Sequence, residues 1–246
     1  MAITTTSHEI HEVLGREVTL PVRVRAATQA SATWSVDADA AQAIIEPSGL
    51  AVARGRRGTT TCSVAVVDYL DNDLGRYHEV AVAFAVAPHD AGPGWTGDPR
   101  RPVTLIHRLP VDGEFTCAAG REIWGFPKWV TEIDLRRHGR STECVLRDRG
   151  AVVLALQIAP GGVPLPAKPL EMSAYSFLDG VLRRTPWTTT SHGAHLRPGG
   201  AVLELGTDHP MADELRTLGV HERSPRFSVT VETMTATFGA AEVVGA

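Results

Sequence analysis

Apolar and polar residues alternate along several segments of this chain. Between residues 17 and 25 the apolar positions are Val18, Leu20, Val22 and Val24, with polar residues or proline between them. A repeat of two residues places the two sets on opposite faces of a β-strand. Pro21 lies inside this run and predicts an edge strand or a bulge, because proline has no N–H for the ladder.

The same kind of reasoning predicts strands along most of the chain, at 31–36, 60–69, 80–86, 103–109, 128–135, 141–146, 151–158, 201–205 and 227–238. Residues 40–45 are expected to form a short helix after the capping sequence 37–39, and 208–218 a second helix capped by Asp208 with Pro210 in its first turn. About nine or ten short strands with two short helices predict an α+β fold dominated by antiparallel sheet.

Turn-forming residues divide these segments. Turns are predicted at 71–73, 138–140 and 148–150, and proline-rich loops at 88–102 and 160–169. Segments 60–69 and 80–86 then form a hairpin-like pair with Glu79 near its mouth. Residues 113–124 are expected to form only about one or two helical turns before Gly125 and Pro127.

Composition indicates one domain covering residues 1–246, with residues 1–12 flexible. A chain of 246 residues with 43% hydrophobic residues can bury a large core without dividing. The net charge of −4 gives no reason to expect nucleic acid or an anionic membrane as a partner. No run of about 18 apolar residues suggests a membrane span, and residues 1–12 lack the apolar core of a signal peptide.

Cysteine usage points to a reducing compartment. The chain has three cysteines, Cys62, Cys117 and Cys144, which are widely spaced and odd in number. They are expected to be reduced thiols that pack in the interior of a cytoplasmic protein.

Lysine is rare in this chain and one of its two lysines has unusual neighbours. Lys128 and Lys168 are the two, although lysine and arginine together number 24. Lys128 lies between Phe126-Pro127 and Trp129-Val130. Apolar surroundings lower the pKa of an amine, and the neutral amine is a nucleophile toward carbonyl carbon. Alternatively, Lys128 lays its methylene stem over aromatic surface and keeps its charge in water. The neighbouring residues leave both interpretations open.

Two segments resemble a known family. Residues 120–128 read GREIWGFPK, which is similar to the active-site segment of the acetoacetate decarboxylases. Residues 73–79 read DLGRYHE and resemble that family's Leu-Gly-x-Tyr-x-Glu sequence. The resemblance covers most of residues 12–244. It implies a curved, cone-like β-barrel with the active site inside, in a homo-oligomer.

The resemblance also implies catalytic residues. The lysine that matches Lys128 forms a Schiff base with a β-keto acid in that family, and the glutamate that matches Glu79 lies in the pocket. An arginine is expected to meet the substrate carboxylate. The match leaves Arg16, Arg23 and Arg25 as candidates, and Arg25 is the residue we expect. Phe126, Trp124 and Trp129 are expected to line the pocket or to pack in the core. Of the three, Phe126 is the residue we expect first in the pocket wall.

One position departs from the family. In the acetoacetate decarboxylases themselves a second lysine directly follows the Schiff-base lysine, and acetoacetate decarboxylase is an example of a lysine activated by desolvation or by a neighbouring cation. This chain has Trp129 there, so activation of Lys128 is expected to come mainly from burial. Alternation along 128–135 places Glu132 on the face of Lys128, where a carboxylate would oppose that activation.

The expected chemistry is formation of a Schiff base and decarboxylation of a β-keto acid, with no metal and no organic cofactor. Aldol condensation with dehydration, or cyclisation, on another carbonyl substrate is an alternative, and so is a non-catalytic relative that binds a small carbonyl compound. The chain has ten histidines. Those at His192, His195 and His209 match no compact metal-ligand spacing.

Overall fold

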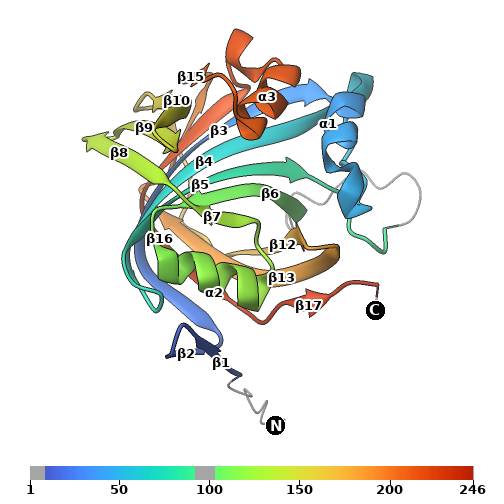
Figure 1. Cartoon of the computed structure of the whole chain (residues 1–246). Helices are drawn as coiled ribbons and strands as arrows, with labels where there is room; N and C mark the ends of the chain where they lie inside the picture. The colour runs from blue at the N-terminus through green and yellow to red at the C-terminus, as the bar shows by residue number, and fades with distance from the viewer. Residues whose placement is uncertain (1–8, 92–102, 246) are drawn as a thin grey trace.

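A computed structural model describes residues 9–91 and 103–245 of the chain. Its centre is a closed barrel of seven strands (Figure 1). In order around the barrel these are β16 (Phe227–Phe238), β3 (Val22–Asp37), β4 (Thr59–Asn72), β5 (Tyr77–Ala85), β6 (Val103–Val111), β12 (Leu170–Leu178) and β13 (Val181–His192). The pairing of β13 with β16 closes the ring. Closure removes the exposed edges that an open sheet of this size would present.

Most neighbours in the barrel are antiparallel, and the exceptions involve β6. Strand β6 pairs in parallel with β12 and with the short strand β7 (Lys128–Val130). Helix α2 (Glu114–Trp124) connects β6 to β7, as a parallel pair requires a crossover connection. This crossover places Lys128 opposite Leu109 of β6.

A second sheet and two further helices lie at one end of the barrel. The sheet has the order β15 (Ala201–Leu205), β10 (Ala151–Ile158), β9 (Ser141–Asp148) and β8 (Glu132–His138). In the view of Figure 1 this sheet, α1 (Ala38–Ile45) and α3 (Pro210–Thr217) lie above, while α2 lies below.

The remaining elements are short. They are β1 (Ile10–Val13), β2 (Arg16–Thr19), β11 (Val163–Pro164), β14 (His195–Pro198), β17 (Glu242–Val243) and 3₁₀ turns at Glu46–Ser48, Arg56–Gly58 and Val220–Glu222. No helix among the residues described here is both long enough and apolar enough to cross a membrane.

The predicted α+β class with mainly antiparallel sheet is confirmed, and several elements differ in extent. Strand β3 continues unbroken through Val22–Asp37, where two separate strands were predicted. Helix α2 has 11 residues and is longer than the predicted one or two turns. The predicted flexible start, residues 1–12, overlaps β1 at residues 10–12. Residues 1–8, and residues 92–102 of the loop predicted at 88–102, lie outside the described residues.

The caps of α1 and α3 show why these helices begin where they do. Asp37 accepts hydrogen bonds from the N–H groups of Asp39 and Ala40, as the sequence predicted. Asp208 does not cap α3, because its φ is positive at 58° and the chain turns there. His209 is the N-cap instead and accepts from the N–H of Met211.

Buried apolar residues form two clusters. One fills the end of the barrel under the second sheet and includes Trp34, Phe84 and Leu154. The other, around α2, includes Tyr77, Trp124 and Phe126. All three cysteines are free and buried, in agreement with the prediction of reduced packing residues.

Candidate active site

A cavity of about 420 Å³ lies inside the barrel, and all seven barrel strands contribute to its wall. Its lining is largely apolar and includes Val22, Val24, Leu109 and Met234. Among the lining residues that the structure describes, only Glu79 and Lys128 carry a charge. Mostly apolar walls with a few converging polar groups are typical of small-molecule sites.

Lys128 and Glu79 meet in this cavity as a buried ion pair. The Nζ atom of Lys128 lies 2.8 Å from Oε2 of Glu79, and their side chains are only 4% and 9% exposed. Lys128 Nζ also donates a hydrogen bond of 3.3 Å to Oγ1 of Thr116, on helix α2. The structure therefore brings together the two residues that the sequence resemblance selected.

Local backbone geometry directs both side chains inward. Glu79 follows Tyr77 by two positions on β5, so both face the interior. Helix α2 ends at Gly125, which has the left-handed φ of 62° that glycine accepts without strain. The chain then turns, and the N–H of Phe126 bonds to the carbonyl of Gly120. This turn starts β7 with Lys128 pointing into the barrel.

Gly120 gives Lys128 the room to lie against α2. A Cβ atom at Gly120 would lie 2.5 Å from Cδ and 2.7 Å from Cε of Lys128. Both distances are shorter than carbon atoms tolerate, so any side chain at this position displaces the lysine.

Replacing Gly120 tests this packing. Gly120→Ala is expected to slow imine formation at Lys128 by about 100-fold, since a displacement of roughly 1 Å in a reacting group has effects of that size. The rate is measured by borohydride trapping. Glu122→Ala, an exposed position on the same helix, is the control. Equal trapping in Gly120→Ala would show that the position of Lys128 does not depend on this contact.

Two tyrosines complete the polar group. Tyr69 OH donates to Oε1 of Glu79 at 3.2 Å, while Oε2 faces Lys128. The rings of Tyr69 and Tyr77 stack with centroids 4.4 Å apart, and Lys128 Nζ lies 5.1 Å from the centroid of Tyr77. Such cation–π contact favours the charged ammonium.

The electrostatics differ from the sequence prediction. Burial lowers the pKa of Lys128, but the charge of Glu79 and the hydrogen bond to it outweigh burial, so that the pKa lies above its ordinary value of 10.5. The expectation that burial dominates is therefore wrong. The amine is held as an ammonium, and it becomes a nucleophile only after giving up a proton.

The tyrosines stay neutral. Burial, together with the nearby Glu79, raises the pKa of Tyr69 well above its usual range. Burial raises the pKa of Tyr77 to about 12, although the charge of Lys128 opposes this shift. Tyr69 therefore keeps its proton and stays a hydrogen-bond donor to Glu79.

The aromatic residues of the active-site segment divide between two sides. Trp124 and Phe126 line the cavity, with ring centroids 6.2 Å apart. Trp129 does not line the cavity and packs against the core instead, so of the two roles expected for it only packing holds. Successive strand residues point to opposite faces, so Trp129 points away from Lys128 and stacks on His209 at 6.2 Å.

Glu132 also lies away from Lys128. The strand predicted for 128–135 is interrupted at Thr131, and β8 belongs to the second sheet. Glu132 is exposed there. The carboxylate that raises the pKa of Lys128 is Glu79 rather than Glu132.

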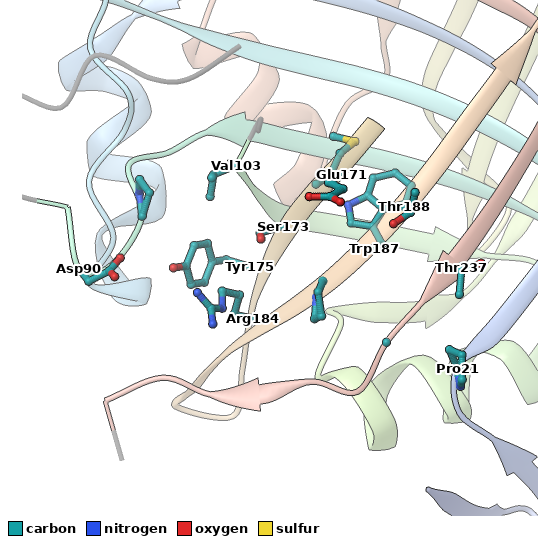
Figure 2. Close-up of a pocket in the computed structure, with 14 residues that line it drawn as sticks. Pro21, Asp90, Val103, Glu171, Ser173, Tyr175, Arg184, Trp187, Thr188 and Thr237 are labelled. Atoms are coloured by element: carbon teal, nitrogen blue, oxygen red, sulfur yellow. The ribbon is translucent and has the colours of Figure 1, made fainter. Parts of the chain in front are cut away.

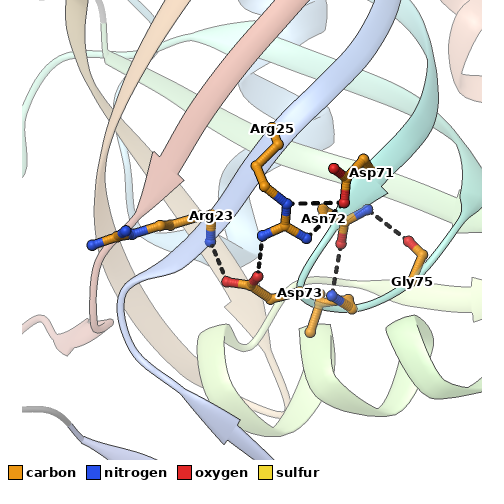
Figure 3. Close-up of polar contacts among 7 residues, drawn as sticks. Arg23, Arg25, Asp71, Asn72, Asp73 and Gly75 are labelled. Atoms are coloured by element: carbon orange, nitrogen blue, oxygen red, sulfur yellow. Dashed lines mark hydrogen bonds and ion pairs between the residues drawn. The ribbon is translucent and has the colours of Figure 1, made fainter.

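Arg25 lies on the outer face of β3 (Figure 3), which corrects the prediction that it meets the substrate. Its guanidinium pairs with Asp71 at 2.7 Å and Asp73 at 2.5 Å. Val22 and Val24 occupy the inner face of the strand, so the alternation that turns them inward turns Arg25 outward. These ion pairs hold β3 against the turn after β4.

Arg25→Ala is therefore expected to leave the rate and extent of imine formation unchanged. Exposed ion pairs contribute little to stability, so a small decrease in melting temperature is the only expected effect. Trapping with acidic and neutral carbonyl compounds provides the measurement. A loss confined to acidic compounds would restore Arg25 as the residue that binds a carboxylate.

An outer pocket of about 650 Å³ adjoins the cavity, and Val103, Met172 and Trp187 line both. Figure 2 shows its polar wall, which includes Tyr175 and Arg184, paired across β12 and β13. The outer pocket and the cavity thus share part of their walls.

Sequence reasoning missed Tyr69, Thr116 and Gly120 as parts of the site. Tyr69 could have been found from hairpin register, because Tyr69 pairs with Tyr77 across β4 and β5. Thr116 had no such signal, since its contact with Lys128 depends on how α2 packs. No group of three or more His, Cys, Asp and Glu side chains in residues 9–91 and 103–245 is arranged to hold a metal ion.

Comparison with known proteins places this geometry in a family. A sequence comparison with curated proteins finds no match. The crystal structure of acetoacetate decarboxylase from Legionella pneumophila is similar, with a TM-score of 0.68, 20% identity, and coverage of 92% of this chain and 87% of that chain.

Two further structures share the fold. An acetoacetate decarboxylase-like enzyme from Sphingomonas wittichii RW1 has a TM-score of 0.59 and 15% identity, over 94% of this chain and 96% of that chain. The enduracididine biosynthesis enzyme MppR complexed with pyruvate has a TM-score of 0.60 and 15% identity, over 91% of this chain and 90% of that chain. The family model described as acetoacetate decarboxylase (ADC) matches residues 13–244. The chain therefore belongs to the acetoacetate decarboxylase family.

Proposed function

We propose that this protein is a lyase that forms a Schiff base between Lys128 and a carbonyl substrate. The observation that supports this most strongly is the buried contact of 2.8 Å between Lys128 Nζ and Glu79 Oε2 inside an apolar cavity. A buried amine beside a carboxylate has a built-in acceptor for the proton it must lose. The amine then attacks carbonyl carbon.

Imine formation starts with transfer of a proton from Lys128 to Glu79. The neutral amine adds to the carbonyl carbon, and the resulting carbinolamine loses its oxygen as water after taking up a proton. The product is a protonated imine, which carries a positive charge close to the Glu79 carboxylate. Tyr69 keeps Glu79 in place during these transfers through its hydrogen bond.

The protonated imine is an electron sink for the next step. In a β-keto acid, the electron pair of the breaking bond to the carboxylate moves into the imine as carbon dioxide leaves. Glu79 takes up a proton from water and delivers it to the enamine carbon, and water then hydrolyses the imine that this step restores. This is the reaction that the sequence resemblance implies.

Aldol-type chemistry is the second candidate. Here Glu79 removes an α-proton from the imine, and the resulting enamine attacks a second carbonyl compound. Trp129 in place of the family's second lysine favours a reaction other than acetoacetate decarboxylation. The position of Arg25 favours it too, because Arg25 lies outside the cavity.

The proposal is tested by intact-protein mass after borohydride reduction with acetoacetate, pyruvate and neutral ketones, together with assays of carbon dioxide and of solvent deuterium in the substrate. An adduct with carbon dioxide release identifies a decarboxylase. An adduct with α-deuteration alone identifies aldol-type chemistry. Absence of any adduct would leave a non-catalytic binding protein.

Assembly and compartment are further parts of the proposal. The resemblance supports a homo-oligomer that takes a small-molecule substrate, and the three free, buried cysteines support a cytoplasmic location. Light scattering coupled to size exclusion measures the oligomer, and a single-chain mass of 26.4 kDa would contradict it.

A further inference from the structure

Aromatic side chains are concentrated around the cavity. The chain has only five Trp, three Tyr and six Phe residues, yet eight of these line it. They are Tyr69, Tyr77, Phe84, Trp124, Phe126, Trp187, Phe227 and Phe238. More than half of the aromatic residues of the chain thus line one cavity.

Four of these rings form a row from the outer pocket toward Lys128. Trp187, which lines both pockets, stacks on Phe238 with centroids 5.1 Å apart and planes at 9°. Phe238 packs against Trp124 at 6.4 Å. The ring centroids of Trp124 and Phe126 lie 6.2 Å apart. Phe126 precedes Lys128 by two residues. The row thus runs from the wall that the two pockets share to the surroundings of Lys128.

The cavity is also larger than a small keto acid needs. Its volume of about 420 Å³ falls in the range of roughly 300–1,000 Å³ typical of pockets for drug-sized ligands. Acetoacetate or pyruvate would occupy a minor part of it and leave most of the aromatic wall without contact. Apolar wall that stays uncovered contributes nothing to binding.

We propose that the carbonyl substrate of this site carries an aryl group, which packs along the row of Trp187, Phe238 and Trp124 while its carbonyl reaches Lys128. The inference rests on the proposed function, because it takes Lys128 as the group that meets the carbonyl. Aromatic rings favour one another in offset or edge-to-face arrangements, and the row offers both faces and edges. A substituent beyond the aryl group extends into the outer pocket.

A matched pair of ketones tests the proposal. Butanone and benzylacetone share the methyl ketone, and benzylacetone adds a phenyl group. Each is trapped with borohydride over a range of concentrations, with acetoacetate and pyruvate alongside. Lys168 is exposed and gives an internal control, since peptide mapping separates an adduct at Lys128 from nonspecific reaction at Lys168.

Benzylacetone is expected to half-saturate Lys128 at a concentration at least about tenfold below that of butanone, as burial of an added ring on apolar wall favours binding. Trp187→Ala is expected to remove most of this preference. Phe238→Leu is a milder variant of the same wall. Trp129→Ala, which changes a tryptophan outside the cavity, should retain the preference.

The outcomes separate this inference from the proposed function. Labelling of Lys128 by acetoacetate, pyruvate or butanone as readily as by benzylacetone would overturn the aryl preference and leave the imine chemistry in place. Retention of the preference in both Trp187→Ala and Phe238→Leu would also overturn it. Labelling of Lys168 without Lys128 by every compound would overturn both proposals.

Discussion

Lys128→Ala is expected to abolish the borohydride-trapped adduct, because the chain has only one other lysine and that residue is exposed. Lys168→Ala is the matched control and should retain full trapping. The measurement is intact mass with and without reductant. An adduct of equal yield in Lys128→Ala would transfer the nucleophile to Lys168 or to the N-terminal amine.

The same substitution is expected to affect stability. It leaves the Glu79 carboxyl buried without its charged partner, and removal of one member of a buried ion pair costs roughly 3–5 kcal/mol. The double variant Lys128→Met with Glu79→Gln removes both charges and should recover most of that loss. Denaturant unfolding of the single and double variants measures it. Equal stability of Lys128→Ala and the native chain would show that the pair does not stabilise the fold.

Glu79→Gln is expected to separate imine formation from turnover. Without the Glu79 charge, burial is opposed only by the contributions of Tyr77 and Cys117, so the pKa of Lys128 falls. The rate of imine formation should then reach half its maximum at a lower pH than in the native chain. Turnover should fall by about 100-fold or more, because the group that moves protons is missing.

Borohydride trapping over a range of pH, together with turnover rates, tests both effects of Glu79→Gln. Glu132→Gln, an exposed glutamate on β8, is the control and should change neither quantity. In Glu79→Gln the pH at which imine formation reaches half its maximal rate could equal that of the native chain, or be higher. Either result would show that Glu79 does not set the charge of Lys128. Unchanged turnover would make Glu79 a structural residue.

Features that depend on residues close together in the sequence were predicted correctly, and features that depend on distant segments were not. Strands β15 (Ala201–Leu205) and β16 (Phe227–Phe238) have the predicted bounds, since alternation and turn residues mark them. The continuity of β3 was missed because register shifts between Val24 and Ala27 disturb its alternation. The parallel pairing of β6 with β12 joins segments distant in sequence, and no local pattern reports such a pairing.

The site shows the same division. Alternation correctly separates Val24 from Arg25, but it does not say which face lies inside the barrel, and so Arg25 was placed at the substrate. Family resemblance selected Lys128 and Glu79, and the structure places them in contact. The raised pKa of Lys128 depends on that contact. The sequence alone provides the two residues and not the distance between them.

Peptide mapping of the borohydride-reduced protein is the most direct test of imine chemistry at Lys128. The native chain is incubated with the ketones and keto acids, reduced, digested and sequenced by mass spectrometry. The account predicts that the added mass is on Lys128 and that Lys168 stays unmodified. Modification confined to Lys168, or a complete lack of adduct on Lys128 with every compound, would contradict it.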